Sequence, residues 1–174
     1  MDKTDSSFVK FHPTPVGNFA VVINEETNQI LASGFTDDLH HLAQIASTGT
    51  LKMGPGSYPM DHVIEGFLYN YFEQRSGSNN IAPKLNIIGT RFQFDIWNAL
   101  SKVPFGATIT YKNLAEKAGY KNAHRAAGTA CAMNRHALII PCHRAIHSNG
   151  KTGSYRWGYK IKQLLLEHES ELNS

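Results

Sequence analysis

Short apolar runs alternate with polar turns over the first third of the chain, a pattern typical of β-strands. Residues 19–23 form one apolar run, residues 24–28 are polar, and residues 29–35 form a second β-prone run. Two such runs joined by a short polar segment predict a β-hairpin. A Pro- and Gly-containing turn is predicted just before it, at residues 14–17.

Helical spacing of apolar positions begins after the hairpin. A short helix is predicted over residues 38–45, and a Gly- and Pro-containing loop over residues 49–59. Apolar residues then recur at intervals of three and four over residues 61–75, which predicts a longer helix with one buried face.

A stretch rich in Ser, Gly and Asn interrupts the pattern after this helix. Residues 76–89 are predicted to be a linker that contains one more strand, at residues 85–88. We therefore expect an N-terminal domain with its linker over residues 1–88 and a C-terminal domain over residues 89–174.

The C-terminal half is mostly helical in pattern. A helix is predicted to start at Thr90 and to end before the turn at residues 104–106. The apolar run 137–140 predicts a buried strand. A Gly- and Ser-rich loop is expected over residues 147–158, followed by a C-terminal helix over residues 159–172.

Two further helices are predicted between these elements. Thr110 is a suitable N-cap for a helix over residues 111–118, and Asn122 is suitable for a second helix that ends near Met133. Gly119 allows a tight turn between them. Two helices joined by a short Gly-containing turn predict a helix-turn-helix.

The composition is that of an ordinary globular protein, with 174 residues, 41% hydrophobic and 18% charged. Cys131 and Cys142 are the two cysteines, too few for a disulfide scaffold, which favours a reducing compartment. No apolar run approaches the roughly 20 residues that span a bilayer, and the polar N-terminus does not resemble a secretory signal. We expect no membrane partner and a cytoplasmic location, or a nuclear one in a eukaryote.

Basic charge is concentrated in the C-terminal half. Residues 1–90 hold 5 Lys and Arg against 9 Asp and Glu, whereas residues 91–174 hold 12 against 5. This asymmetry indicates that the C-terminal half contacts a polyanion, although basic surfaces also occur without one.

Cys142 lies in an unusual local cluster, Pro141-Cys142-His143-Arg144. The thiolate is the reactive form of cysteine, so a nucleophilic Cys142 requires a base or a positive charge nearby. On a strand the side chain of His143 would point away from Cys142, so it acts only if the backbone turns there or a water molecule bridges the two. The alternative is an inert buried cysteine.

The chain resembles the O6-alkylguanine-DNA alkyltransferase family, whose active-site motif is Pro-Cys-His-Arg. The resemblance covers residues 90–169 almost throughout and extends to residues 14–17. It implies an α/β (α+β) fold, with a small ribonuclease-H-like N-terminal domain of sheet and helix. The C-terminal domain would be mostly helical and would contain the helix-turn-helix.

The resemblance also implies catalytic roles. Cys142 would accept the alkyl group, and His143 would take its proton through a water molecule. Glu169 would hold the tautomer of His143, with Glu167 and Glu171 as alternative carboxylates. Arg144 is expected to brace the site.

DNA contacts are implied for the second helix of the helix-turn-helix and its surroundings. Arg125 would fill the gap left when the damaged base rotates out of the duplex, and Tyr111 would crowd its phosphate and donate a hydrogen bond to the base. Small residues would let this helix lie deep in the minor groove, although close packing in the core is the alternative interpretation. The expected DNA-contacting positions are Tyr111, Asn122, Arg125, Ala126, Ala127 and Gly128.

The guanine pocket is expected to be lined by Cys131, Asn134, Cys142, Ala145, Tyr155, Arg156 and Trp157. Asn134 would also satisfy backbone groups at a sharp turn. Trp157 stands where many relatives have glycine, and we hypothesise that it narrows the pocket against large adducts such as benzyl.

The implied activity is direct-reversal repair of double-stranded DNA by a methylated-DNA–protein-cysteine S-methyltransferase. The alkyl group of O6-alkylguanine, and that of O4-alkylthymine as a second substrate, would move irreversibly to Cys142, once per molecule. We expect a monomer without cofactor or metal, and cooperative binding to DNA remains open. The rival interpretations are a non-catalytic lesion sensor, a cysteine hydrolase and a helix-turn-helix regulator.

Overall fold

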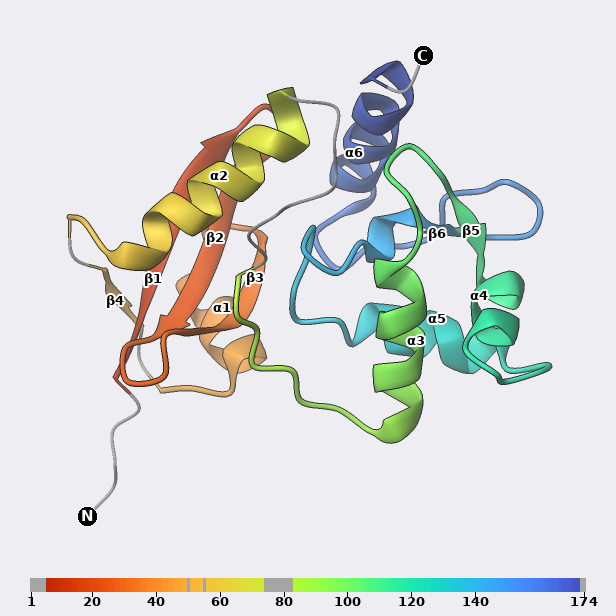
Figure 1. Ribbon diagram of the computed structural model, residues 1–174, viewed down its shortest axis with the longest axis horizontal. Coiled ribbons are helices and arrows are strands. Elements are labelled where there is room, and N and C mark those ends of the chain that lie inside the picture. The colour runs from red at the N-terminus through yellow and green to blue at the C-terminus, as the bar shows by residue number, and fades with distance from the viewer. Residues whose placement is uncertain (1–5, 50, 55, 74–82, 173–174) are drawn as a thin grey trace. The chain divides into compact units, whose positions relative to one another are not determined.

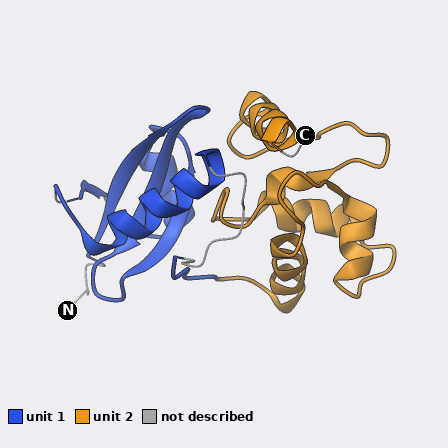
Figure 2. Ribbon diagram, turned by 45° about the horizontal axis from the view of Figure 1, so that its top comes forward, with its two compact units in different colours: residues 1–87 blue, residues 88–174 orange. Residues whose placement is uncertain are grey.

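The computed structural model describes residues 6–49, 51–54, 56–73 and 83–172. The chain divides into two compact units, residues 1–87 and 88–174, each with its own core (Figure 2). Within the described residues, no helix is long and apolar enough to cross a membrane.

Unit 1 is built on a four-stranded sheet in the order β3-β2-β1-β4. The strands are β1 (Ser7–Thr14), β2 (Gly17–Asn24), β3 (Gln29–Phe35) and β4 (Lys52–Met53). β1 and β3 each pair antiparallel with β2, and β4 runs parallel to β1.

Helices cover both faces of this sheet. Residues Phe19–Asn24 of β2 are buried without interruption, although their side chains alternate between the two faces. The helix α2 (Pro59–Glu73) crosses one face, and α1 (Leu39–Ala46) lies behind the sheet (Figure 1).

The predicted hairpin is confirmed, as are the turn that precedes it and the two helices that follow; residues 74–75 of the second predicted helix lie outside the described residues. Asp38 lies just outside α1 because its carboxylate caps the helix, accepting a hydrogen bond from the amide of His41.

Two strands of unit 1 were missed, and one predicted strand was wrong. β1 was not predicted, because Lys10, His12 and Pro13 interrupt its apolar pattern. β4 lies inside the predicted loop 49–59. The strand expected at residues 85–88 is only an isolated bridge, in which Leu85 pairs with Ile30.

Unit 2 contains four α-helices in its described residues: α3 (Arg91–Ser101), α4 (Tyr111–Lys117), α5 (His124–Ala132) and α6 (Tyr159–Leu172). Thr90 and Gln93 form a capping box at the start of α3, and Thr110 caps α4 through the amide of Asn113. Both predicted helix starts are confirmed. The indole nitrogen of Trp97 donates to the Ala130 carbonyl at 2.9 Å, which joins α3 to α5.

Two predictions for unit 2 were wrong. Asn122 does not cap α5, since Ala123 occupies the cap position and makes no side-chain cap bond. Asn122 instead adopts a left-handed conformation with φ of 60°, which asparagine tolerates better than most residues.

The apolar run 137–140 forms a turn rather than a strand, with Ala137, Leu138 and Ile140 buried. Leu138 has φ of 68°, and the side chain of Asn134 binds the turn by donating to the Ile140 carbonyl at 2.9 Å. The chain then enters a short 3-10 helix, η1 (Cys142–Arg144), and the strand β6 (Ala145–Ile146). β6 pairs in parallel with β5 (Ile109–Thr110), which leads directly into α4.

Candidate active site

Cys142 lies at the first position of η1, where the backbone turns. Its side chain is buried, and the amide of Asn134 donates a hydrogen bond to Sγ at 3.0 Å. The same amide accepts from the backbone N–H of His136 at 2.9 Å. Asn134 therefore fixes both the turn and the orientation of the thiol.

The two residues that follow Cys142, His143 and Arg144, form a buried network with Glu169 of α6. The Nε2–H of His143 donates to Oε1 of Glu169 at 2.6 Å. The guanidinium of Arg144 donates from Nε to Oε2 of the same carboxylate at 2.9 Å, and from Nη1 to the Val103 carbonyl at 2.7 Å. Glu169 also accepts from the Gly106 amide at 2.9 Å. One carboxylate thus joins α6, η1 and the loop after α3.

This network fixes the chemistry of the imidazole. With the proton held on Nε2, Nδ1 becomes the basic atom of the His143 ring. Glu169 is the carboxylate that contacts His143, whereas Glu167 and Glu171 are exposed. Arg144 holds the same carboxylate and the Val103 carbonyl together.

Burial sets the resting protonation of the site. It raises the pKa of the Cys142 thiol, against the opposing effects of the Asn134 hydrogen bond and the positive charge of Lys162. It also lowers the pKa of His143, although Glu169 acts in the opposite direction. Burial raises the pKa of the Glu169 carboxyl, but the hydrogen bonds from His143 and Arg144 and the positive charge of Arg144 outweigh it and lower the pKa to about 2. The resting pair is therefore a thiol and a neutral imidazole next to a carboxylate.

Lys162 is a functional candidate that the sequence analysis missed. Its side chain is almost completely buried, and Nζ donates to the Ala145 carbonyl at 2.7 Å and lies 5.9 Å from the centre of the Tyr111 ring. Burial lowers the pKa of Lys162, while the nearby Cys142 and Cys131 sulfurs raise it. The spacing of residues along α6 could have indicated its burial, because Lys162 lies on the same helix face as the buried residues Leu165 and Glu169.

A small cavity of about 40 Å³ lies against Cys142. Six of the seven residues expected to form the guanine pocket line it, namely Cys131, Asn134, Cys142, Tyr155, Arg156 and Trp157. Ala145 does not line it; this residue is buried, and its carbonyl binds Lys162. Tyr111, Gly128, Ala132 and Ser154 complete the lining. Burial raises the pKa of Tyr111 to about 12, which keeps its hydroxyl protonated at neutral pH.

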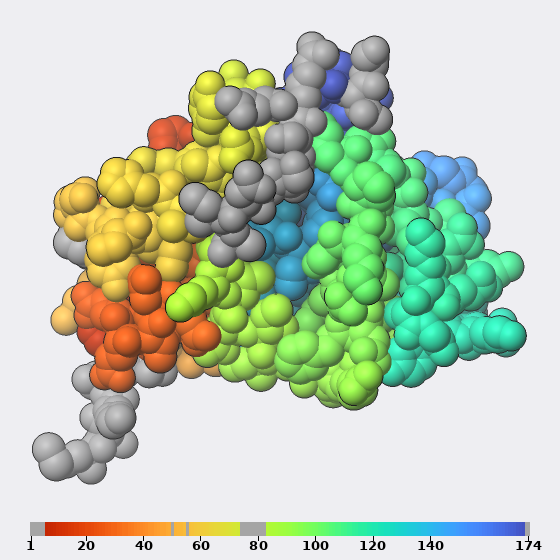
Figure 3. All heavy atoms as spheres, in the orientation of Figure 1, coloured from red at the N-terminus to blue at the C-terminus, as the bar shows by residue number. Residues whose placement is uncertain are grey.

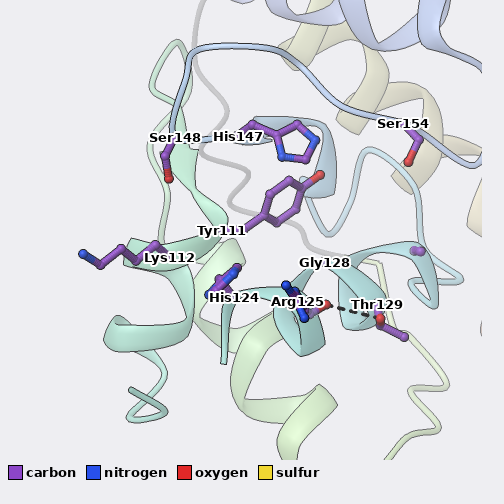
Figure 4. A pocket seen from close by; sticks show the side chains of 10 residues that line it. Tyr111, Lys112, His124, Arg125, Gly128, Thr129, His147, Ser148 and Ser154 are labelled. Carbon is purple, nitrogen blue, oxygen red and sulfur yellow. Dashed lines mark hydrogen bonds between the residues drawn. The ribbon is translucent and has the colours of Figure 1, made fainter. Parts of the chain in front are cut away.

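A larger groove of about 410 Å³ opens beside this cavity and shares Tyr111, Gly128, Ala132 and Ser154 with it. Arg125 lines the groove with Tyr111, as Figure 4 shows. We call this surface the cationic groove; its lining residues are Tyr111, Lys112, His124, Arg125, Gly128, Thr129, Ala132, His147, Ser148 and Ser154.

The remaining predicted DNA contacts lie outside this groove. Ala126 and Asn122 are exposed, whereas Ala127 is completely buried. Close packing in the core therefore describes Ala127, which was the alternative interpretation of the small residues.

Unit 2 combines a buried cysteine, Cys142, with two consecutive packed helices, α4 and α5, joined by a short turn. Residues 91–171 match the family model described as the 6-O-methylguanine DNA methyltransferase, DNA binding domain. The chain is 42% identical over 144 residues to the methylated-DNA–protein-cysteine methyltransferase of Candida albicans, covering 83% of this chain and 77% of that one. The chain therefore belongs to the methylated-DNA–protein-cysteine methyltransferase family.

Other relatives match over different extents. The bifunctional transcriptional activator/DNA repair enzyme Ada of Escherichia coli is 46% identical over 87 residues, which cover 50% of this chain and 25% of Ada. The chain thus spans about a quarter of the length of that relative. The crystal structure of the Mycobacterium tuberculosis O6-methylguanine methyltransferase aligns with a TM-score of 0.78 at 26% identity, over 95% of this chain and 93% of that one. A structure of the M. tuberculosis protein in complex with DNA aligns with a TM-score of 0.75 at 26% identity, over 95% and 94% of the two chains.

Proposed function

We propose that this chain repairs double-stranded DNA by moving the alkyl group of O6-alkylguanine onto Sγ of Cys142. The observation that carries the proposal is the arrangement around that sulfur. Cys142 receives a hydrogen bond from Asn134, is followed by the His143–Glu169 pair, and lies in a cavity next to Tyr111. The DNA complex of the M. tuberculosis protein supports DNA as the partner.

The damaged base must leave the duplex to reach a buried sulfur. Arg125 is exposed at the first turn of α5 and lines the cationic groove, so its long side chain can occupy the space that the base vacates. Gly128 lies one turn later on α5 and lines both the groove and the cavity, which lets the backbone come close to the extruded base. The cavity beside Cys142 is thereby connected to the cationic groove.

The transfer is a direct displacement at carbon. The thiol proton of Cys142 passes through a water molecule to Nδ1 of His143, and Glu169 stabilises the imidazolium that forms. The Sγ–C bond forms as the bond between carbon and O6 breaks, and the purine leaves with a proton donated by Tyr111. Asn134 and Lys162 stabilise the negative charge on sulfur before the transfer.

The product sulfur is a thioether, which is a poor leaving group. None of the groups described around Cys142 supplies a nucleophile aligned to remove the alkyl group, so each molecule acts once. A cysteine hydrolase would turn over repeatedly, and a sequence-reading regulator would not become alkylated. We place this activity in the compartment that holds the DNA, the cytoplasm of a prokaryote or the nucleus of a eukaryote.

The decisive experiment is intact-mass measurement of the protein after incubation with duplex DNA that contains one O6-methylguanine. We expect each molecule to gain the mass of one methyl group, with the modification on the peptide that contains Cys142. An undamaged duplex of the same sequence is the control. Unmodified protein, or continued loss of lesions beyond one per molecule, would overturn the proposal.

Substitution of Trp157 with glycine is expected to change which alkyl groups are accepted. Trp157 is buried and lines the cavity of about 40 Å³ beside Cys142, so its indole restricts the space for a large adduct. We expect Trp157→Gly to raise the rate with O6-benzylguanine relative to O6-methylguanine by about 10-fold or more. Single-turnover rates with both substrates measure this ratio, and equal rates in the unsubstituted protein would contradict the steric argument.

A further inference from the structure

The cationic groove contains two histidines that the proposed transfer does not use. His124 is the first residue of α5, and His147 lies in the loop that follows β6. In Figure 4 the His147 ring lies above Tyr111, with His124 and Arg125 below. The rings of His147 and Tyr111 are 5.2 Å apart at an angle of 66°. Both histidines are exposed to solvent, so a ligand entering the groove can reach them.

The lining of the groove is cationic and contains no carboxylate. Lys112 and Arg125 carry permanent positive charge, and the hydroxyls of Thr129, Ser148 and Ser154 can donate hydrogen bonds. Lys112 belongs to α4, and in Figure 3 the green-to-teal spheres of α4 and the turn that follows it lie at the surface. Such a lining fits an anion, and for a protein that binds duplex DNA the anion is a backbone phosphate.

The groups around the two histidines are mostly positively charged. His124 lies at the start of α5, where the helix dipole is positive, and Lys112 and Arg125 line the same groove. The His147 ring packs against Tyr111 of α4, and the ammonium of Lys162 from α6 lies 5.9 Å from the centre of the same Tyr111 ring. The exposed Lys151 belongs to the same loop and accepts the backbone N–H of His147.

We propose that His124 and His147 bind the phosphates of the DNA backbone in their protonated form, so that duplex binding takes up protons. This inference rests on the proposed function, because it assigns the groove to DNA. A phosphate adds the negative charge that the lining lacks and thereby favours the imidazolium form. Histidine changes charge near neutral pH, so the affinity for DNA rises as the pH falls from 8 to 6. The cationic side chains of Lys112 and Arg125 set the affinity that remains at pH 8.

The test is fluorescence anisotropy with an undamaged, labelled duplex at pH 6 and pH 8 and at constant ionic strength. We expect the affinity to be about 10-fold higher at pH 6, with a steeper salt dependence, since each extra phosphate contact adds about 0.9 to the slope of log K against log salt. The double variant His124→Gln/His147→Gln should change by less than about 2-fold between the two pH values. The matched control is His62→Gln, an exposed histidine of α2 in unit 1, which should behave as the unsubstituted protein does.

Circular dichroism of the double variant at both pH values establishes that it is folded. A double variant that keeps the full pH dependence would overturn the inference, and so would a pH-independent affinity of the unsubstituted protein. In either case methyl transfer to Cys142 in the mass experiment would leave the proposed function standing. Conversely, pH-dependent duplex binding without methyl transfer would remove the proposed function and keep the phosphate contacts.

Discussion

Serine in place of Cys142 is expected to leave the protein mass unchanged after incubation with DNA that contains O6-methylguanine. Serine is close in size to cysteine, and the amide of Asn134 that donates to Sγ can donate to a hydroxyl in the same position. A buried hydroxyl does not ionise near neutral pH, however, so the nucleophile is lost while the fold remains. We expect the rate of transfer to fall by at least about 10³-fold, the scale on which loss of a covalent nucleophile acts.

Cys131→Ser is the matched control for this variant. Cys131 and Cys142 line the same cavity, and burial raises the pKa of both thiols, so burial alone does not distinguish them. The distinction is the hydrogen bond from Asn134, which is made to Cys142. We expect Cys131→Ser to gain one methyl group. A methyl group found on Cys131 in the Cys142→Ser variant would show that Cys131 can accept the alkyl group, and would contradict the assignment of Cys142 as the acceptor.

Local signals in the sequence predicted most helices of this protein. Thr90 and Thr110 are helix caps because their hydroxyls satisfy amides only three residues away, at Gln93 and Asn113. Such contacts depend on neighbouring residues alone. The motif around Cys142 was also visible, because its residues are consecutive in the chain.

Features that depend on distant parts of the chain were not predicted. The apolar pattern of β1 is interrupted by Lys10. The Nζ atom of Lys10 lies 3.0 Å from Oδ2 of Asp61 on α2, a contact that the sequence does not show. The turn before Cys142 has an apolar sequence like that of a strand, and the amide of Asn134 bends it by binding the Ile140 carbonyl. Lys162 was missed because its burial depends on contacts with Ala145 and Tyr111, which are distant in the sequence. In each case a polar side chain makes an ion pair or a hydrogen bond with a group that is brought close only by folding.

Glutamine in place of Glu169 is expected to destabilise unit 2 by about 3–5 kcal/mol, because it leaves the buried guanidinium of Arg144 without a negative partner. The amide also lacks the charge that stabilises the His143 imidazolium, so methyl transfer should slow in the fraction that remains folded. Urea unfolding at pH 7 measures the loss of stability. Trp97 and Trp157, the two tryptophans of the chain, both lie in unit 2, so their fluorescence reports on that unit. Glu167→Gln, at an exposed position of α6, should change stability by less than about 0.5 kcal/mol.

Measuring stability against pH in acid separates the contribution of the Glu169 charge from that of its side-chain packing. Its carboxyl pKa is about 2 in the folded protein, against an ordinary value of 4.5. The folded state therefore binds fewer protons than the unfolded state between these values, and stability falls as the pH decreases through this window. The difference corresponds to about 3 kcal/mol, all of it present above pH 4.5 and lost by pH 2. Glu169→Gln has no proton to bind there, so its stability should fall less steeply over the same range. Parallel acid curves for the two proteins would show that the carboxylate contributes through packing rather than charge.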